Sequence, residues 1–149
     1  MFHAHNLRRA VHLMIALACS TPICFAQSTT IHILMIDGRN GHPWANKHIN
    51  IYDASSDPRF GFKTLEEGKT DKDGVFVATL QSLSMISVSG GIRTQLCITS
   101  ATAPKWRVSD VVANGAVQEN NCNFKINAIA IPGDLVIFIR PESLKEFLD

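Results

Sequence analysis

The chain has 149 residues, of which 46% are hydrophobic and 18% charged, with 14 Lys and Arg against 13 Asp and Glu. This length fits one ordinary domain with a buried core. The near-neutral balance, without a cluster of Lys and Arg, argues against a nucleic-acid-binding protein and against one held on anionic lipid.

Residues 1–26 have the features of a secretory signal peptide. Arg8 and Arg9 precede a short apolar run, and small residues stand at −3 and −1 of a cut before Gln27. The run is shorter than the about 20 apolar residues of a membrane-spanning helix. We therefore predict export of residues 27–149 to the periplasm or the exterior, with no transmembrane span after cleavage.

A lipoprotein signal is the alternative for the same segment. The sequence Ala16-Leu17-Ala18-Cys19 approaches the pattern in which the cysteine becomes the lipidated first residue. The usual Leu at −3 is replaced by Ala16, so we favour simple cleavage over lipidation of Cys19.

Cleavage would leave two of the four cysteines, Cys97 and Cys122, in a chain of 123 residues (149 less 26). Two cysteines in an exported domain usually pair, because the compartment is oxidising. The bridge would close a loop of 25 residues (122 less 97) and contribute roughly 3.5 kcal/mol in the chain-entropy model. The alternative is two free, buried thiols.

The first half of the exported chain alternates apolar segments with turn-forming residues. Turns are predicted at 37–43, 66–69 and 71–74, where Gly and Pro gather and Gly74 supplies the positive φ that a hairpin needs. A polar loop is predicted at 53–59, between the first and second of these turns. Strands are predicted over residues 29–36, 49–53, 61–65 and 75–80, which are rich in β-branched or alternating apolar residues.

Three further strands are predicted at 84–89, 92–99 and 135–139. The last of these is apolar on both faces, which is typical of a strand in the middle of a sheet or sandwich.

Helix is scarce. Residues 109–115 resemble one or two helical turns, with Ser109 as N-cap and Gly115 as the stop. A short amphipathic helix is predicted at 142–148, with Pro141 in its first turn. About seven short strands with little helix indicate an all-β fold, a β-sandwich or barrel.

Two turn motifs carry a family resemblance. Gly41–Asn46 (GHPWAN) before Ile49–Ile51 (INI) is similar to a G-x-P-x-x-x…V-x-V pattern, and Thr70–Phe76 (TDKDGVF) to T-D-x-x-G-x-F. Both patterns resemble those of carboxypeptidase-regulatory-like domains, which are transthyretin-like, immunoglobulin-like β-sandwiches. The resemblance implies that the Gly, Pro and Asp residues shape two hairpins and that Phe76 enters the core.

The later chain resembles a group of exported bacterial proteins built on this domain. In that group a strand Cys is joined to a Cys in an N-x-C loop, and the pattern P-G-x-L-V-x-F-x-R-P follows. The corresponding residues are Cys97, Asn120–Cys122 and Pro132–Pro141. The resemblance implies an accessory, structural or binding module and brings no catalytic activity with it.

No catalytic constellation is evident, and we predict no cofactor. His32, His42 and His48 match no zinc-binding spacing, so we interpret them as surface or turn residues rather than metal ligands. The run Asp71–Gly74 has a trace of a calcium loop but lacks the downstream Glu, and turn chemistry explains it better.

The two tryptophans are the candidate ligand-binding residues. Trp44 lies in the first turn and Trp106 follows Pro104-Lys105 in a loop. Exposed tryptophans on the loops of a sandwich could stack on a sugar or a peptide. We favour the alternative that each closes an end of the core.

We predict an exported, non-enzymatic β-sandwich module that binds or supports an envelope protein or a glycan, and no nucleic acid. The first alternative is an extracytoplasmic hydrolase with an unrecognised site, which could use the histidines and a metal. The second is a structural envelope protein that self-associates through a sheet edge or the C-terminal helix.

Overall fold

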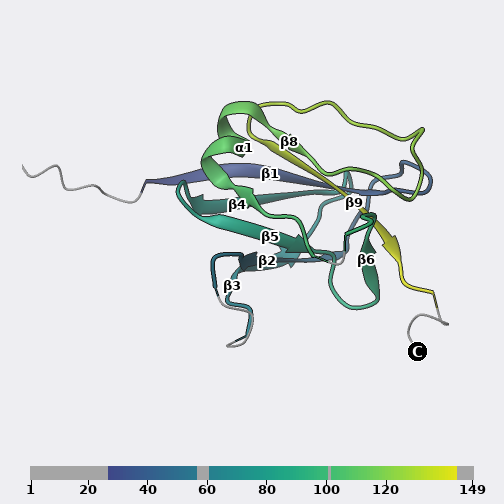
Figure 1. Cartoon of the computed structure of the whole chain (residues 1–149), viewed down its shortest axis with the longest axis horizontal. Coiled ribbons are helices and arrows are strands. Elements are labelled where there is room, and N and C mark those ends of the chain that lie inside the picture. Colours follow the sequence, from purple (N-terminus) through teal and green to yellow (C-terminus); the bar gives the residue numbers. More distant parts are fainter. Residues whose placement is uncertain (1–26, 57–60, 101, 144–149) are drawn as a thin grey trace, which may run out of the picture.

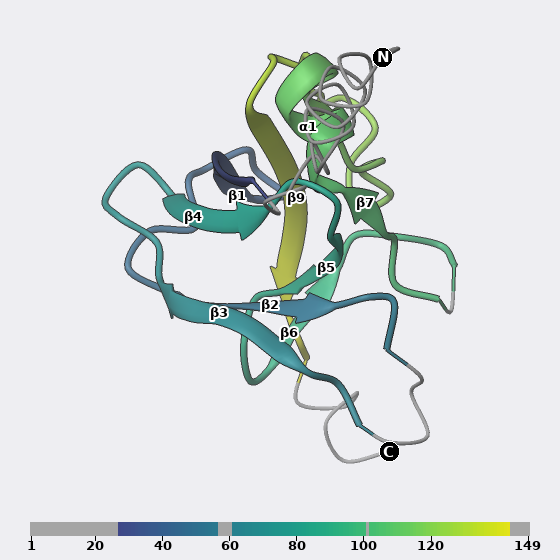
Figure 2. The same ribbon diagram turned by 90° about the vertical axis from the view of Figure 1, so that its left-hand side faces the viewer.

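A computed structural model describes residues 27–56, 61–100 and 102–143 of the chain (Figure 1). Within these residues the chain forms nine strands in two sheets and one short α-helix. The two sheets form two layers, so the predicted all-β sandwich class is confirmed (Figure 2). The predicted signal peptide, residues 1–26, lies outside the described residues.

The first sheet contains β1 (Ser28–Asp37), β4 (Val75–Gln81), β6 (Thr94–Leu96), β8 (Ala116–Val117) and β9 (Asp134–Pro141). Its order is β4-β1-β9-β6, and β8 also pairs with β9. The two central strands, β1 and β9, are parallel, whereas β4 and β6 run antiparallel to their neighbours.

The second sheet contains β2 (His48–Asp53), β3 (Thr64–Lys69), β5 (Met85–Ser89) and β7 (Trp106–Arg107). Its order is β3-β2-β5-β7, and all of its pairs are antiparallel. β7 and β8 were not predicted from the sequence, because strands of two residues leave no periodic pattern.

The core lies between the two sheets. Ile49 and Ile51 of β2 and Ile31, Ile33 and Met35 of β1 are fully buried there. Burial of each such side chain contributes about 1.5–3 kcal/mol. Because side chains alternate along a strand, the residues between these positions on β2 face outward, away from the core.

The first sheet is also covered on its other face. Phe138 of β9 is buried there beneath residues 118–131, the long loop after β8. Cys97 and Cys122 form a disulfide that ties residues 118–131, which we call the disulfide loop, to the chain just after β6. Since both faces are covered, β9 is buried from Leu135 to Ile139, which confirms the prediction of a strand in the middle of a sheet.

Asn120 fixes the conformation of the same loop. Its side chain is buried, and Nδ2 donates to the backbone oxygens of Gly38 (2.9 Å) and Ile126 (3.1 Å). The same nitrogen lies 3.1 Å from the oxygen of Asn123, and Oδ1 accepts the N–H of Cys122. The first Asn of the N-x-C motif therefore joins the disulfide loop to the turn after β1.

One helix, α1 (Val108–Asn114), lies beside β1 and β9 and buries Val108 and Val111. Gly115, with a φ of 69°, ends the helix as predicted. A Cβ at this position would lie 2.2 Å from the carbonyl oxygen of Ile131, so only glycine fits.

The prediction of Ser109 as N-cap is wrong. Arg107 occupies the cap position, and no side chain caps the helix. Instead, the N–H groups of Val108 and Ser109 donate to the carbonyl oxygens of Ser84 and Ser82 between β4 and β5. Backbone acceptors from a neighbouring turn thus replace a side-chain cap.

The third strand is shifted from its predicted place. The strand predicted at 61–65 lies further along the chain, as β3 (Thr64–Lys69). The turn predicted at 66–69 is therefore wrong, because these residues belong to the strand. A Cβ on Gly68 would lie 2.5 Å from Cε2 of Phe76, so this glycine makes room for an aromatic ring and does not mark a turn. Phe76 packs against the core as predicted.

Two other predicted segments change at their ends. The strand predicted at 92–99 is reduced to β6, because Arg93 adopts a φ of 61° in the loop before it. Pro141 pairs with Thr94 within β9 and does not begin a helix. Residues 144–149, most of the predicted C-terminal helix, lie outside the described residues. Among the described helices none is long and apolar enough to cross a membrane.

Candidate functional site

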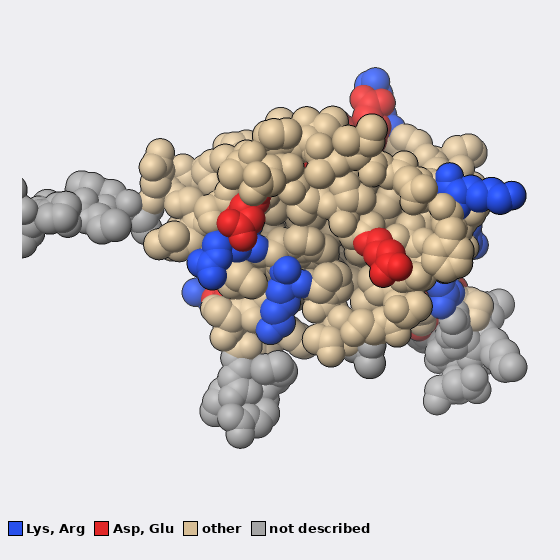
Figure 3. Space-filling model, turned by 45° about the horizontal axis from the view of Figure 1, so that its top comes forward, with Lys and Arg blue, Asp and Glu red and all other residues tan. Residues whose placement is uncertain are grey.

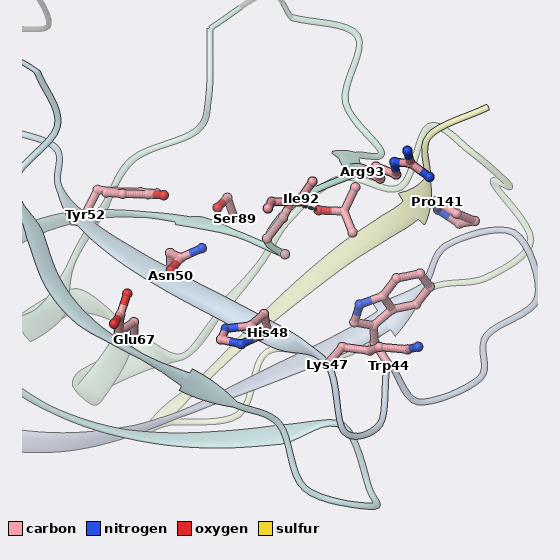
Figure 4. A pocket seen from close by; sticks show the side chains of 13 residues that line it. Trp44, Lys47, His48, Asn50, Tyr52, Glu67, Ser89, Ile92, Arg93 and Pro141 are labelled. Carbon is pink, nitrogen blue, oxygen red and sulfur yellow. Dashed lines mark hydrogen bonds between the residues drawn. The ribbon is translucent and has the colours of Figure 1, made fainter. Parts of the chain in front are cut away.

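An open groove of about 780 Å³ lies on the outer face of the second sheet. It lies over β2, between β3 and β5, and the loop 90–93 that joins β5 to β6 forms its other wall (Figure 4). We call it the β2 groove. Its lining includes Trp44, Lys47, His48, Asn50, Tyr52, Glu67, Ser89, Ile92, Arg93 and Pro141.

Polar side chains from three neighbouring strands meet in the β2 groove. His48, Asn50 and Tyr52 are the outward residues of β2, and Asn50 stands opposite Glu67 of β3 and Ser89 of β5. Figure 4 shows these side chains around one space. Within the described residues, none of the five makes a side-chain hydrogen bond. The groove therefore offers an imidazole, an amide, a phenol, a carboxylate and a hydroxyl to a ligand.

The opposite wall is a short loop held close to β2. The hydroxyl of Thr94 donates to the carbonyl oxygen of Gly91 at 2.8 Å. Gly91 has a φ of 83°, and a Cβ there would lie 3.0 Å from Cβ of His48. Glycine thus permits both the turn and the close approach. Ile92, beside it, is 93% exposed and gives the groove an apolar rim.

Trp44 closes one end of the groove, and the two turn motifs hold it there. The hydroxyl of Thr70 donates to the carbonyl oxygen of Trp44 and accepts the N–H of Lys47. The N–H of Trp44 donates to Met35 at 2.8 Å. A Cβ on Gly74 would lie 2.6 Å from that Met35 oxygen, so the glycine of the second motif permits this contact.

The indole of Trp44 combines packing with an unused donor. The side chain is partly buried and packs against the core, as we favoured from the sequence. Its Nε1 is buried and has no acceptor within the described residues. Figure 4 shows the nitrogen edge of the ring turned toward the groove. A buried donor without an acceptor costs about 1–3 kcal/mol, so a ligand oxygen that reached it would be favoured.

Trp106 lies elsewhere. It pairs with Ile86 across β5 and β7, is partly buried and packs against the core. It lines a separate cavity of about 270 Å³. The structure therefore does not bring the two tryptophans together: each supports the core, and each lines a cavity of its own.

The histidines are also dispersed. In β1, Nδ1 of His32 lies 3.1 Å from Oδ1 of Asp134. His42 is exposed after β1, and His48 lines the β2 groove. Across the described ranges there is no group of three or more His, Cys, Asp or Glu side chains that could hold a metal ion.

The run Asp71–Gly74 forms the predicted turn. Oδ1 of Asp71 accepts the N–H groups of Asp73 (2.8 Å) and Val75 (2.9 Å), and Gly74 has a φ of 78°. The carboxylate oxygen is thus engaged inside the turn, where turn chemistry requires it.

Carboxyl groups with a shifted pKa lie outside the β2 groove. The hydrogen bond from the Arg39 guanidinium lowers the pKa of Asp37 below its ordinary value, against the effect of burial. Hydrogen bonds from the hydroxyl and the N–H of Ser55 lower the pKa of Asp53. Both partners are two residues along the chain, so these shifts belong to the loops after β1 and β2 and not to an acid–base pair.

On the face drawn in Figure 3, Lys, Arg, Asp and Glu side chains are scattered over a much larger uncharged area, in places with the two signs side by side. The β2 groove contains both signs, with Lys47 and Arg93 against Glu67. This mixture favours a neutral polar ligand over a strongly charged one.

No known protein-family model matches the chain, and no curated protein matches it.

Trp44 was predicted from the sequence as a candidate ligand-binding residue, whereas the polar residues of the groove were not. Their signal was the alternation at 49–53, because inward Ile49 and Ile51 imply an outward Asn50. Residues from neighbouring strands could not be added, since a strand's periodicity does not reveal its partners.

Proposed function

We propose that the protein is an exported, non-enzymatic module of the carboxypeptidase-regulatory-like, transthyretin-like class that binds a neutral glycan in the β2 groove. Membership of this class is supported by the motif residues Thr70 and Gly74, which hold the turn of Trp44. Export is supported by the features of residues 1–26 and by the disulfide, a bond that persists in oxidising compartments.

The observation that carries the proposal is the set of unpartnered polar side chains beside aromatic rings. A sugar presents hydroxyl groups that donate and accept, which suits Asn50, Glu67 and His48 together. Its C–H faces pack on aromatic rings, which Tyr52 and Trp44 supply along the groove. Few polar groups at fixed positions next to apolar surface are typical of small-ligand sites.

The hydrolase is the alternative for the same groove. Hydrolysis of a glycosidic bond canonically uses two carboxyl groups, one on either side of the bond. Glu67 is the one carboxylate among the described residues that line the β2 groove, so we favour binding over turnover.

Titration calorimetry with neutral oligosaccharides selected on a glycan array tests the proposal. We expect Asn50→Ala to weaken binding by about 5–30-fold, because one or two hydrogen bonds of about 1 kcal/mol each are lost. The matched control is Asn114→Ala, an exposed residue of α1 that does not line the groove.

Three results would contradict the proposal. Release of reducing ends from the bound oligosaccharide would favour the hydrolase, and a chelator would then show whether a metal takes part. Equal binding by the Asn50→Ala and Asn114→Ala proteins would show that the glycan does not bind in the β2 groove. Capture of peptides but not of glycans on arrays would show that the ligand is not a glycan.

A further inference from the structure

A second cavity lies where two strands separate beside β9. β8 pairs with the first part of β9 and β6 with its last part. Between them, the carbonyl oxygen of Phe138 accepts both the N–H of Cys97 (2.9 Å) and Nε2 of Gln118 (3.0 Å). Residues following β6 and residues following β8 line a cavity of about 270 Å³, which we call the fork pocket.

Gln118 lines the fork pocket with an unpaired acceptor. The residue is 4% exposed, and its N–H donates to the carbonyl oxygen of Val136 at 2.9 Å. Its amide orientation is determined, because the opposite one would place Oε1 against the carbonyl oxygen of Phe138. Oε1 is therefore the atom that is buried without a partner within the described residues.

Asn121 lines the same pocket with an unpaired donor. Its N–H donates to the carbonyl oxygen of Cys97 at 2.8 Å, which fixes its backbone. Its Nδ2 is buried and has no acceptor within the described residues. Because buried polar groups in folded proteins are nearly always paired, an acceptor and a donor at one cavity together point to a ligand.

The other residues that line the fork pocket limit the kind of ligand that it can bind. Trp106 and Pro104 supply an apolar surface, and Glu119 is the charged residue among those that line the pocket. An acidic neighbour disfavours an anion, and a simple cation cannot accept from Asn121. The volume is slightly below the about 300 Å³ at which ordinary small-molecule sites begin, so one small group fits.

We propose that the fork pocket binds a secondary amide, independently of the β2 groove. The amide N–H donates to Oε1 of Gln118, the amide oxygen accepts from Nδ2 of Asn121, and the adjoining methyl or methylene packs on Trp106. Such a group is carried by an acetylated amino sugar and by a short peptide, and the experiment below separates these two sources.

Tryptophan fluorescence can test this assignment directly. The chain has two tryptophans, so Trp44→Phe leaves Trp106 as the reporter. We expect saturable changes with N-acetylglucosamine or with N-acetylalanine methylamide, and none with glucose, which has no amide. In this background Asn121→Asp replaces the donor by a carboxylate oxygen, and we expect at least tenfold weaker binding. The control Asn46→Asp adds the same charge outside the pocket.

A second measurement avoids substitutions. In the unsubstituted protein, titration with either amide should shift the side-chain NH₂ resonances of Gln118 and Asn121, while that of Asn114, which lines neither cavity, stays in place. A response to one of the two amides supports the proposal and identifies the source. A response to neither, an equal response to glucose, or equal affinity of the Asn121→Asp and Asn46→Asp proteins would overturn it.

Discussion

At the residue scale, buried polar side chains determine the loops that surround the sheets. Asp37, at the end of β1, is 6% exposed and accepts hydrogen bonds from Nε (3.0 Å) and Nη2 (2.8 Å) of Arg39. Asn120 joins the same turn to the disulfide loop through the carbonyl oxygen of Gly38. These contacts hold one end of the first sheet, so their loss should affect stability more than ligand binding.

The interaction between Asp37 and Arg39 should make the stability of the protein depend on pH. Its folded-state pKa is lowered from the ordinary 3.8, chiefly by the hydrogen bond from Arg39. The ionised carboxylate therefore contributes stability that is fully present above the unfolded pKa and is lost as the pH falls through the folded pKa. We expect Arg39→Gln to reduce the free energy of unfolding at pH 7 by about 1–2 kcal/mol, and this difference to vanish at a pH below the folded pKa.

Urea unfolding followed by circular dichroism between pH 2 and pH 7 measures this difference. Lys72→Gln is the control, because Lys72 and Asp73 form an exposed pair that should contribute little. A constant difference between Arg39→Gln and the unsubstituted protein at every pH would show that Arg39 acts through packing and not through the charge of Asp37.

Residues whose role depends on local backbone geometry were predictable from the sequence. Gly74 and Gly115 have the positive φ values expected of a hairpin and a helix stop. The pairing of Cys97 with Cys122 was favoured by compartment chemistry. The way in which α1 begins was not predictable, because its first N–H groups are bonded by backbone carbonyls of a turn more than twenty residues earlier in the chain and not by the side chain of Ser109.

At the element scale, β3 shows why a glycine can mislead. Glu66-Glu67-Gly68-Lys69 has a turn-like composition, yet the chain continues as a strand, since the ring of Phe76 lies over the glycine. Glu66 also serves the neighbouring sheet, where Oε2 accepts the N–H of Thr79 at 3.1 Å on the free edge of β4. This bond occupies an edge donor that another chain would need for strand pairing, which counts against self-association at that position.

Gly68 is a position in a strand at which alanine should destabilise the protein. Alanine is normally favoured over glycine within a strand, by roughly 0.5–1 kcal/mol. Here we expect Gly68→Ala to destabilise the protein by about 1–3 kcal/mol, because its Cβ would displace the ring of Phe76. The same change in a Phe76→Leu background should cost clearly less. Chemical denaturation of the four proteins measures this coupling, and additive effects would contradict the contact.

At the scale of the whole molecule, the fold class was predictable but the cavities were not. Strand periodicity and turn chemistry indicated two layers of β-sheet. The β2 groove and the fork pocket both form between segments that are distant in sequence, as Asn50, Glu67 and Ser89 illustrate. Register and strand order determine such neighbours, and neither follows from the pattern of a single segment.

The disulfide links the stability of the molecule to the fork pocket. It closes a loop of 25 residues, and the chain-entropy model gives it roughly 3.5 kcal/mol of a typical total of about 5–15 kcal/mol. We expect the double substitution Cys97→Ala and Cys122→Ala to lower the free energy of unfolding by about that amount. Urea unfolding at neutral pH, with the reduced unsubstituted protein as the control, measures the loss.

The same double substitution should weaken ligand binding in the fork pocket even while the protein is still folded. Asn121 is next to Cys122, and its N–H donates to the carbonyl oxygen of Cys97, so the disulfide and this hydrogen bond hold one wall of the fork pocket. Under conditions in which the double variant is folded, we therefore expect weaker amide binding in the fork pocket and unchanged glycan binding in the β2 groove. Equal losses at both sites would instead indicate a general loosening of the sandwich, because no residue that lines the β2 groove belongs to the disulfide loop.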